Sequence, residues 1–180
     1  MMRSLEQVLK DGIRDIPDYP QAGVMFKDIT PLLADHEGFS LVVQALAAAG
    51  KDADGNVVVD KVVGIEARGF ILAAPVALAL GAGFVPVRKK GKLPAATYEE
   101  SYALEYGEAT IEVHQDAFTP GDRVLVIDDV LATGGTVEAC LRLVRRCGAE
   151  VVGTTVLLEL SFLPGRKRLD GEKLSALVTV

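Results

Sequence analysis

Five apolar runs rich in valine and isoleucine recur along the chain, several of them separated by segments of helix length with apolar periodicity. The runs are continuously apolar rather than alternating, which is typical of parallel strands covered on both faces. We therefore expect an α/β fold with a mostly parallel twisted sheet flanked by helices. The predicted strands lie within 57–65, 84–87, 124–127, 151–160 and 176–180, and the predicted helices span about 2–15, 36–49, 68–80 and 135–148.

One uncharged run, "GFILAAPVALALGAGFVPV" at residues 69–87, is long enough to cross a membrane. The proline and glycine residues within the run argue against a membrane span. Pro75 would kink a membrane helix, and the "GAG" at 81–83 is typical of a helix stop and turn. We expect a buried helix followed by a buried strand, and no membrane association.

Size, charge and cysteine content narrow the class of protein. A chain of 180 residues can bury one substantial core, so we expect a single domain. The net charge of -6 disfavours a nucleic-acid partner, because such proteins normally carry a basic excess. The first twenty residues lack the apolar core of a signal peptide, and Cys140 and Cys147 lie too far apart on one predicted helix to form a disulfide. A reducing, cytoplasmic location is expected.

The stretch "VLVIDDVLATGGTVEA" at residues 124–139 carries the strongest chemical signal. A strand over 123–127 is followed by Asp128 and Asp129, and a loop of small residues then opens a helix. Helix N-termini present unpaired N–H groups and a positive dipole end, and glycines let a phosphate approach the backbone closely. For the glycines alone, a tight turn with an aspartate capping the helix is the simpler explanation. It explains two adjacent carboxylates poorly, because such a pair is costly unless it finds donors or cations.

Two further segments suit anions. In "GIEARGF", residues 64–70, Arg68 stands where a helix is expected to begin, and its guanidinium could hold a phosphate bidentately. A capping Glu66 paired with a surface arginine is the alternative. "RKKGK" at 88–92 is either a solvated face or an edge that binds polyanions. The motifs of P-loop NTPases and of dinucleotide-binding folds are absent, which favours phosphate joined to ribose over ATP or NAD.

These segments together resemble a known family. "VLVIDDVLATGGT" is similar to the phosphoribosyl pyrophosphate-binding motif of type I phosphoribosyltransferases. The chain resembles the adenine-specific branch of that family from end to end, through four further segments. They are "DYPQAGVMFKDITPLL" at 18–33, "GIEARGF" at 64–70, "RKKGKLP" at 88–94 and "SYALEYG" at 101–107.

The resemblance implies how the phosphoribosyl donor would be held. The loop residues Ala132, Thr133, Gly134, Gly135 and Thr136 would wrap its 5-phosphate, and Asp128 and Asp129 would hold the ribose hydroxyls. Arg68, Arg88 and Lys92 would hold the pyrophosphate, with Mg²⁺ bound through the substrate rather than directly by the protein. The resemblance also allows a non-prolyl cis peptide between Glu66 and Ala67.

The resemblance also implies a site for the base and a proton donor. An N-terminal hood of about 1–34 would bind adenine through Met25, Phe26 and Lys27, although Phe26 could equally be a core anchor. A mobile lid of about 92–108 would bring Glu105 to the base as the catalytic acid. Without the family this stretch could be a solvated loop, and its tyrosines at every fourth position could mark a short lid helix.

The implied activity is purine salvage: adenine and phosphoribosyl pyrophosphate give AMP and pyrophosphate. Two alternatives stay open, namely a phosphoribosyltransferase for another base and a phosphoribosyl pyrophosphate-sensing regulator of the same fold. The resemblance implies a homodimer, and the mean hydropathy of +0.29 is apolar for so small a chain.

Overall fold

The computed structural model describes residues 3–104 and 107–180, and its chain forms two compact units, Met1–Gln44 and Ala45–Val180. The first unit contains α1 (Leu5–Gly12), β1 (Arg14–Pro17), β2 (Met25–Asp28), α2 (Thr30–Ala34) and most of α3 (His36–Ala47). The Ser4 hydroxyl caps α1 by accepting the Gln7 N–H at 3.2 Å. The predicted helix over 2–15 was too long, because the backbone turns extended at Ile13 and the following residues pair with β2.

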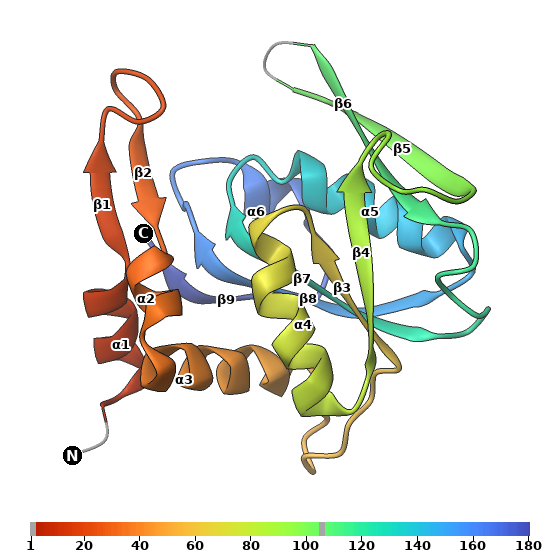
Figure 1. Cartoon of the computed structure of the whole chain (residues 1–180), viewed down its shortest axis with the longest axis horizontal. Coiled ribbons are helices and arrows are strands. Elements are labelled where there is room, and N and C mark those ends of the chain that lie inside the picture. The colour runs from red at the N-terminus through yellow and green to blue at the C-terminus, as the bar shows by residue number, and fades with distance from the viewer. Residues whose placement is uncertain (1–2, 105–106) are drawn as a thin grey trace. The chain divides into compact units, whose positions relative to one another are not determined.

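The second unit is built on a seven-stranded sheet of order β5-β6-β4-β3-β7-β8-β9 (Figure 1). Its parallel strands are β3 (Lys61–Ile65), β4 (Gly83–Lys89), β7 (Arg123–Leu131), β8 (Glu150–Glu159) and β9 (Leu174–Thr179). The helical elements are η1 (Ala48–Gly50), α4 (Arg68–Leu80), α5 (Gly135–Arg146) and α6 (Gly165–Arg168). The predicted fold class is therefore confirmed, with five predicted strands and the helices α3, α4 and α5 close to their expected bounds.

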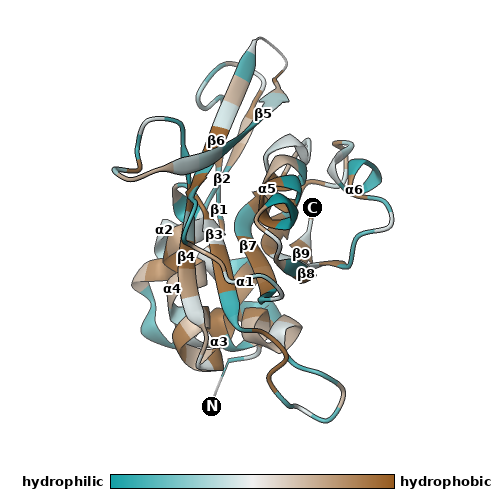
Figure 2. Ribbon diagram, turned by 90° about the vertical axis from the view of Figure 1, so that its right-hand side faces the viewer, coloured by the Kyte–Doolittle hydropathy of each residue, from teal (hydrophilic) through white to brown (hydrophobic). Residues whose placement is uncertain are grey.

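Helices cover both faces of the parallel strands, which explains why those strands lack alternation. Val63 and Ile65 of β3 pack in the same buried cluster as Val137 and Val144 of α5. Between those two strand residues, Gly64 faces α4, where a Cβ would lie 2.8 Å from Ala73. Because successive side chains of a strand point to opposite faces, α4 and α5 cover opposite sides. The hydropathy colouring shows the central strands as largely apolar (Figure 2).

An antiparallel hairpin extends one edge of this sheet and was not predicted. It consists of β5 (Thr97–Ala103) and β6 (Glu108–His114), and β6 also pairs with β4. The suggestion of a short lid helix was wrong, because Tyr98 and Tyr102 both lie in β5. Residues four apart share a face in a strand as well as in a helix, so the tyrosine spacing could not separate the two. In Figure 2 the hairpin projects beyond the central strands.

The uncharged run at 69–87 forms α4, its turn and part of β4, as predicted. The predicted burial of these elements is only partly right, because Leu78 is 84% and Ile71 44% exposed. α4 continues through Pro75 and ends at Gly81, whose φ of 65° is the left-handed conformation that glycine favours at helix ends. Within the part of the chain that the structure describes, no helix has both the length and the apolarity needed to cross a membrane.

Candidate functional site

The loop after β7 is shaped by close backbone packing. Gly134 has a φ of 80°, and a Cβ on it would lie 3.0 Å from the Gly165 carbonyl oxygen. A Cβ on Gly165 would lie 2.3 Å from the Ala132 carbonyl oxygen, so both positions exclude larger residues. The loop encloses a cavity of about 70 Å³ lined by Asp128, Ala132, Thr133, Gly134, Thr136 and neighbouring apolar residues.

This loop leaves the N-terminus of α5 open to a ligand. The N-cap residue is Gly134, and no side chain caps the helix by a hydrogen bond. The alternative of an aspartate cap is therefore wrong for α5. Residues 128–131 belong to β7 itself, so the two aspartates lie near the end of the strand rather than in the loop after it. Strand pairing with β8 extends to Leu131, which places the carboxylates rigidly beside the loop.

The two aspartates differ in environment. Asp129 is 6% exposed, and its Oδ2 lies 2.6 Å from the Arg68 Nε in an ion pair. The Asp128 Oδ1 accepts the Asp129 N–H at 2.9 Å. Burial, followed by the negative charge of Asp129, raises the pKa of Asp128 well above its usual range. A raised pKa favours the protonated form, and a protonated carboxyl group can donate as well as accept toward a hydroxyl-bearing ligand.

α4 begins directly against this pair. A Cβ on Gly69 would lie 3.0 Å from the Asp128 Oδ1, so glycine permits the helix to approach the carboxylate. The peptide between Glu66 and Ala67 is cis, as the resemblance allowed. Glu66 accepts the Lys89 N–H at 2.9 Å and pairs with Arg88 at 3.2 Å. Burial opposes ionisation of Glu66, but these two donors outweigh it and lower the pKa.

A cavity of about 360 Å³ joins the ends of β3 and β7 with the β5–β6 hairpin. Its polar lining consists of Glu66, Arg68, Lys89, Tyr102, Asp128, Asp129 and Thr136. Arg68, both aspartates and Thr136 were predicted site residues, and the fold brings them together. Lys89 and Tyr102 were not predicted as site residues, although Lys89 lies in "RKKGK" and Tyr102 in "SYALEYG".

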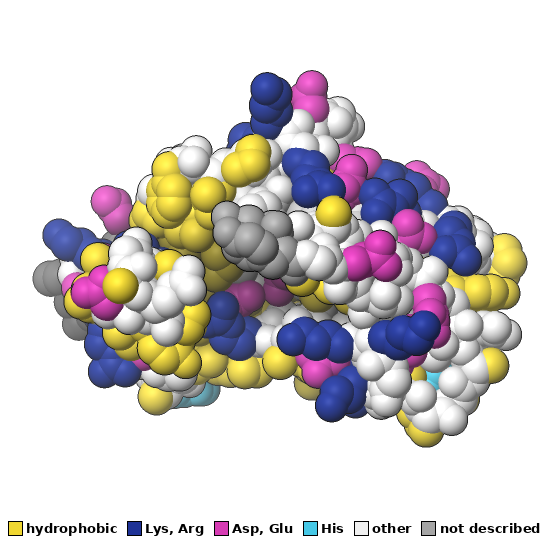
Figure 3. Space-filling view, turned by 90° about the horizontal axis from the view of Figure 1, so that it is seen from above, with side chains coloured by type: hydrophobic (Ala, Val, Ile, Leu, Met, Phe, Trp, Pro, Cys, Tyr) yellow, Lys and Arg dark blue, Asp and Glu magenta, His cyan; other side chains and the backbone are white. Residues whose placement is uncertain are grey.

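The other two basic residues predicted for pyrophosphate do not line this cavity. The Arg88 guanidinium meets Glu66 and donates to the Lys92 carbonyl at 3.2 Å. The Lys92 N–H donates to Glu112 at 2.9 Å. Lys90, in the same basic run, pairs with Glu99 at 2.8 Å. On the face seen in Figure 3, basic and acidic side chains are likewise interspersed.

A larger cavity, of about 1180 Å³, includes Thr133 of the 132–136 loop in its lining. It is lined by Ala103, Leu104, Thr133, Leu163, Pro164, Lys167 and Arg168. Residues 163–168 carried no chemical motif that sequence reasoning could use. A Pro-Gly pair ahead of a basic run was the one available signal.

The predicted base-binding residues belong to the first unit. Phe26 is half-buried and packs edge-on to Tyr19 at 5.1 Å between ring centroids. Lys27 pairs with Asp15 at 2.7 Å, and Met25 is 47% exposed. Their contact with a base stays a prediction. Glu105 lies outside the described residues, so its role as the catalytic acid also stays a prediction.

The donor set of this site fits a metal that arrives with its ligand. Among residues 3–104 and 107–180, no group of three or more His, Cys, Asp or Glu side chains could hold a metal ion. Two adjacent carboxylates beside an arginine and the open N-terminus of α5 suit a ligand that carries both anionic groups and a cation.

Comparisons with known proteins agree with this geometry. The phosphoribosyl transferase domain family matches residues 32–174. Adenine phosphoribosyltransferase from Nocardioides sp. is 66% identical over 168 residues, covering 93% of this chain and 91% of that protein. The Streptomyces coelicolor enzyme of the same name is 59% identical over 180 residues, covering 98% and 97%.

Solved structures give the same result. Adenine phosphoribosyltransferase from Rhodothermus marinus has a TM-score of 0.90 and 54% identity, with 98% of each chain covered. The Saccharomyces cerevisiae enzyme, complexed with an imino-altritol bisphosphate and adenine, has a TM-score of 0.91 and 36% identity, with 97% and 98% covered. The chain therefore belongs to the phosphoribosyltransferase family, and within it to the adenine phosphoribosyltransferases.

Proposed function

We propose that this chain transfers the 5-phosphoribosyl group of phosphoribosyl pyrophosphate to adenine, giving AMP and pyrophosphate. The observation that carries the proposal is one cavity that gathers a bare helix N-terminus, two carboxylates and an arginine. Adenine phosphoribosyltransferases among the relatives, at 56–66% identity over nearly the whole chain, support adenine as the base.

The loop Ala132–Thr136 would bind the 5-phosphate through its N–H groups and hydroxyls. Asp128 and Asp129 would accept hydrogen bonds from the ribose hydroxyls. Arg68 would give up part of its ion pair with Asp129 and bind the pyrophosphate. Arg88 would have to leave Glu66 and the Lys92 carbonyl to join it, and Lys92 would join it through its side-chain ammonium. Mg²⁺ carried by the pyrophosphate would neutralise the charge that develops on the leaving group.

Displacement at the anomeric carbon passes through an oxocarbenium-like state, which water would destroy. The 92–108 lid would exclude water, and Met25, Phe26 and Lys27 of the hood would hold adenine. Pyrophosphate release should therefore be measured with Mg²⁺, phosphoribosyl pyrophosphate and a panel of adenine, hypoxanthine, guanine, xanthine and orotate. We expect turnover with adenine at least tenfold above the others. Preference for another base would end the adenine assignment, and binding without turnover would favour a regulator.

Glu105 is the proposed acid that protonates the base nitrogen N7. Changing Glu105→Gln removes the proton but keeps the shape, so kcat should fall at least a hundredfold, within the usual range for a lost general acid. The Kd for phosphoribosyl pyrophosphate should change little. Glu108→Gln, an exposed neighbour at the start of β6, is the matched control. Equal kcat values for the two variants would remove Glu105 from the mechanism.

We also propose a homodimer located in the cytoplasm, on the basis of the family resemblance. Sedimentation equilibrium at micromolar concentration tests the association, and a single species with the mass of one chain would contradict it.

A further inference from the structure

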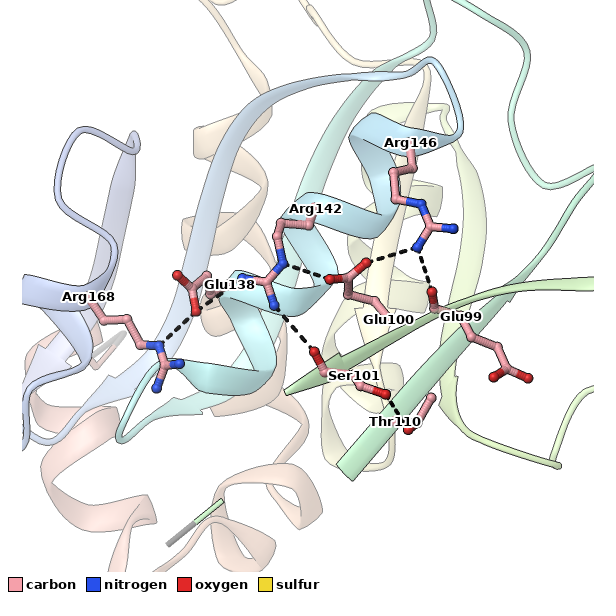
Figure 4. A network of polar contacts seen from close by, with 8 residues as sticks. All are labelled: Glu99, Glu100, Ser101, Thr110, Glu138, Arg142, Arg146 and Arg168. Carbon is pink, nitrogen blue, oxygen red and sulfur yellow. Dashed lines mark hydrogen bonds and ion pairs between the residues drawn. The ribbon is translucent and has the colours of Figure 1, made fainter. Parts of the chain in front are cut away.

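The β5–β6 hairpin is attached by ion pairs to α5, the helix whose N-terminus forms the phosphate loop. The Glu100 carboxylate of β5 lies between Arg142 and Arg146 of α5, at 2.8 Å and 2.9 Å (Figure 4). Arg146 also donates to the Glu99 carbonyl at 2.7 Å. β5 lies within the predicted lid of about 92–108, so these ion pairs attach that part of the lid to α5.

Tyr102 makes the contact of β5 that reaches the phosphate loop itself. Its hydroxyl accepts a hydrogen bond from the Thr136 Oγ1 at 3.0 Å. The ring packs against the buried cluster beneath α5, and a Cβ on Gly135 would lie 3.2 Å from the ring. The side chain is therefore held along its length, and its hydroxyl has a defined position beside Thr136.

The donor and acceptor capacity of the two hydroxyls determines how this contact responds when a phosphate binds. A threonine hydroxyl has one hydrogen to donate and two lone pairs that accept. Thr136 now donates its hydrogen to Tyr102. With a phosphate in the loop, Thr136 would donate to a phosphate oxygen, and the Tyr102 O–H would donate to Thr136 in turn. The contact is kept with its direction reversed, and a charge-assisted bond forms at its far end.

From this geometry we propose that Tyr102 is a positioning residue for the phosphoribosyl donor, acting through Thr136. It orients the Thr136 hydroxyl toward the 5-phosphate and links β5 to the 132–136 loop when a phosphate is bound there. The inference rests on the proposed role of 132–136 as the 5-phosphate site. Tyr102 touches no reacting atom in this scheme, so its effect falls on donor binding.

The test is a double-mutant cycle on Tyr102→Phe and Thr136→Val, with steady-state kinetics and direct binding of phosphoribosyl pyrophosphate. Removing one hydrogen bond should raise the KM and Kd for this donor about fivefold. The kcat and the KM for adenine should stay within about twofold, because the lost interaction is made equally in the ground and transition states. In the Thr136→Val background, Tyr102→Phe should have no further effect.

Two matched variants separate this role from a structural one. Tyr98→Phe removes an exposed hydroxyl four residues earlier on β5 and should leave the donor KM unchanged. Thr136→Ser keeps the hydroxyl and should restore the sensitivity to Tyr102→Phe. Thermal melts of all the variants check that the fold is intact.

Each result decides a different statement. If Tyr102→Phe behaves like Tyr98→Phe while Thr136→Val raises the donor KM, the positioning role is wrong and the phosphate-loop assignment stands. If Thr136→Val also has no effect, the assignment of the loop fails with it. Independent, additive effects of the two substitutions would show that Tyr102 does not act through Thr136 and would overturn the inference.

Discussion

Asp128 sits in the site at a cost to the stability of the fold. Its folded pKa is raised by burial and by Asp129, so its protonated form is favoured and its ionised form is destabilising. The favourable contribution is complete below the unfolded pKa of about 3.9 and is lost as the pH rises through the folded pKa.

Replacing Asp128→Asn should therefore stabilise the ligand-free protein at pH 7 while lowering its activity. Removing an unfavourable buried charge should raise the Tm by several degrees, because about 1 kcal/mol moves the Tm of a chain of this size by about 2–4 °C. The gain should vanish as the pH approaches 4. Thermal melts between pH 4 and 8 measure it, with the exposed Asp116→Asn as control. A lower Tm at pH 7 would contradict the assignment of a repelled carboxylate.

Gly134 allows a comparison of conformation with crowding. An L-residue at its φ of 80° costs about 1–2 kcal/mol, and here a Cβ would also press against Gly165. Gly134→Ala should therefore lower the Tm and weaken donor binding at least tenfold. Gly55→Ala has a similar φ of 84° but open space around it, so it should lower the Tm alone. Equal donor affinity in both variants would contradict a phosphate cradle at Gly134.

At the scale of elements, β6 pairs with β4 at Arg88 and Lys89, and the rest of the β5–β6 hairpin extends beyond that pairing. A further attachment helps because a two-stranded hairpin is marginal by itself in water. Glu100, whose side chain is 17% exposed, is attached by hydrogen bonds from Arg142 and then Arg146, which lower its pKa. The stabilisation is present above the ordinary glutamate pKa and is lost as the pH falls through the lowered one.

Glu100→Gln should therefore speed amide hydrogen exchange across β5 and β6 at pH 7, by about two- to fivefold for a contribution of about 0.4–1 kcal/mol. The difference from the parent should shrink toward pH 3. Glu99→Gln removes a more exposed ion pair, with Lys90, and should change exchange less. Identical exchange in Glu100→Gln and the parent would show that the pairs with α5 do not hold the hairpin.

At the scale of the whole molecule, the reactivity of the two cysteines distinguishes global unfolding from local fraying of α5. Cys140 is fully buried in the cluster between α5 and the sheet, and burial raises its pKa. Cys147 is partly exposed at the end of α5, and burial raises its pKa less. Cys140 should react with a thiol reagent only through global unfolding, whereas Cys147 should react through local fraying.

Mass spectrometry of labelled peptides along a urea series can follow both thiols. The labelling rate of Cys140 should follow the global unfolding free energy, and that of Cys147 should depend weakly on urea. Similar urea dependence at both positions would mean that the end of α5 opens only with the whole unit.

Elements that depend on local sequence pattern were predicted better than elements that depend on contacts with residues far away along the chain. The parallel strands and α4 and α5 were predictable because continuous burial and apolar periodicity are local properties of sequence. The β5–β6 hairpin was missed because most of its residues are polar, and part of its attachment comes from Arg142 and Arg146, more than forty residues away. β1 and β2 were missed because short antiparallel strands owe little to local pattern.

The sequence by itself determined the chemistry available: the glycine loop, the adjacent aspartates, Arg68 and the family resemblance. These are runs of neighbouring residues, and their residue types and spacing are legible without a fold. Only the tertiary structure decided which groups meet, such as Arg68 with Asp129 and Tyr102 with Thr136. Those partners lie tens of residues apart, and the order of strands in the sheet, a property of packing, determines whether they touch.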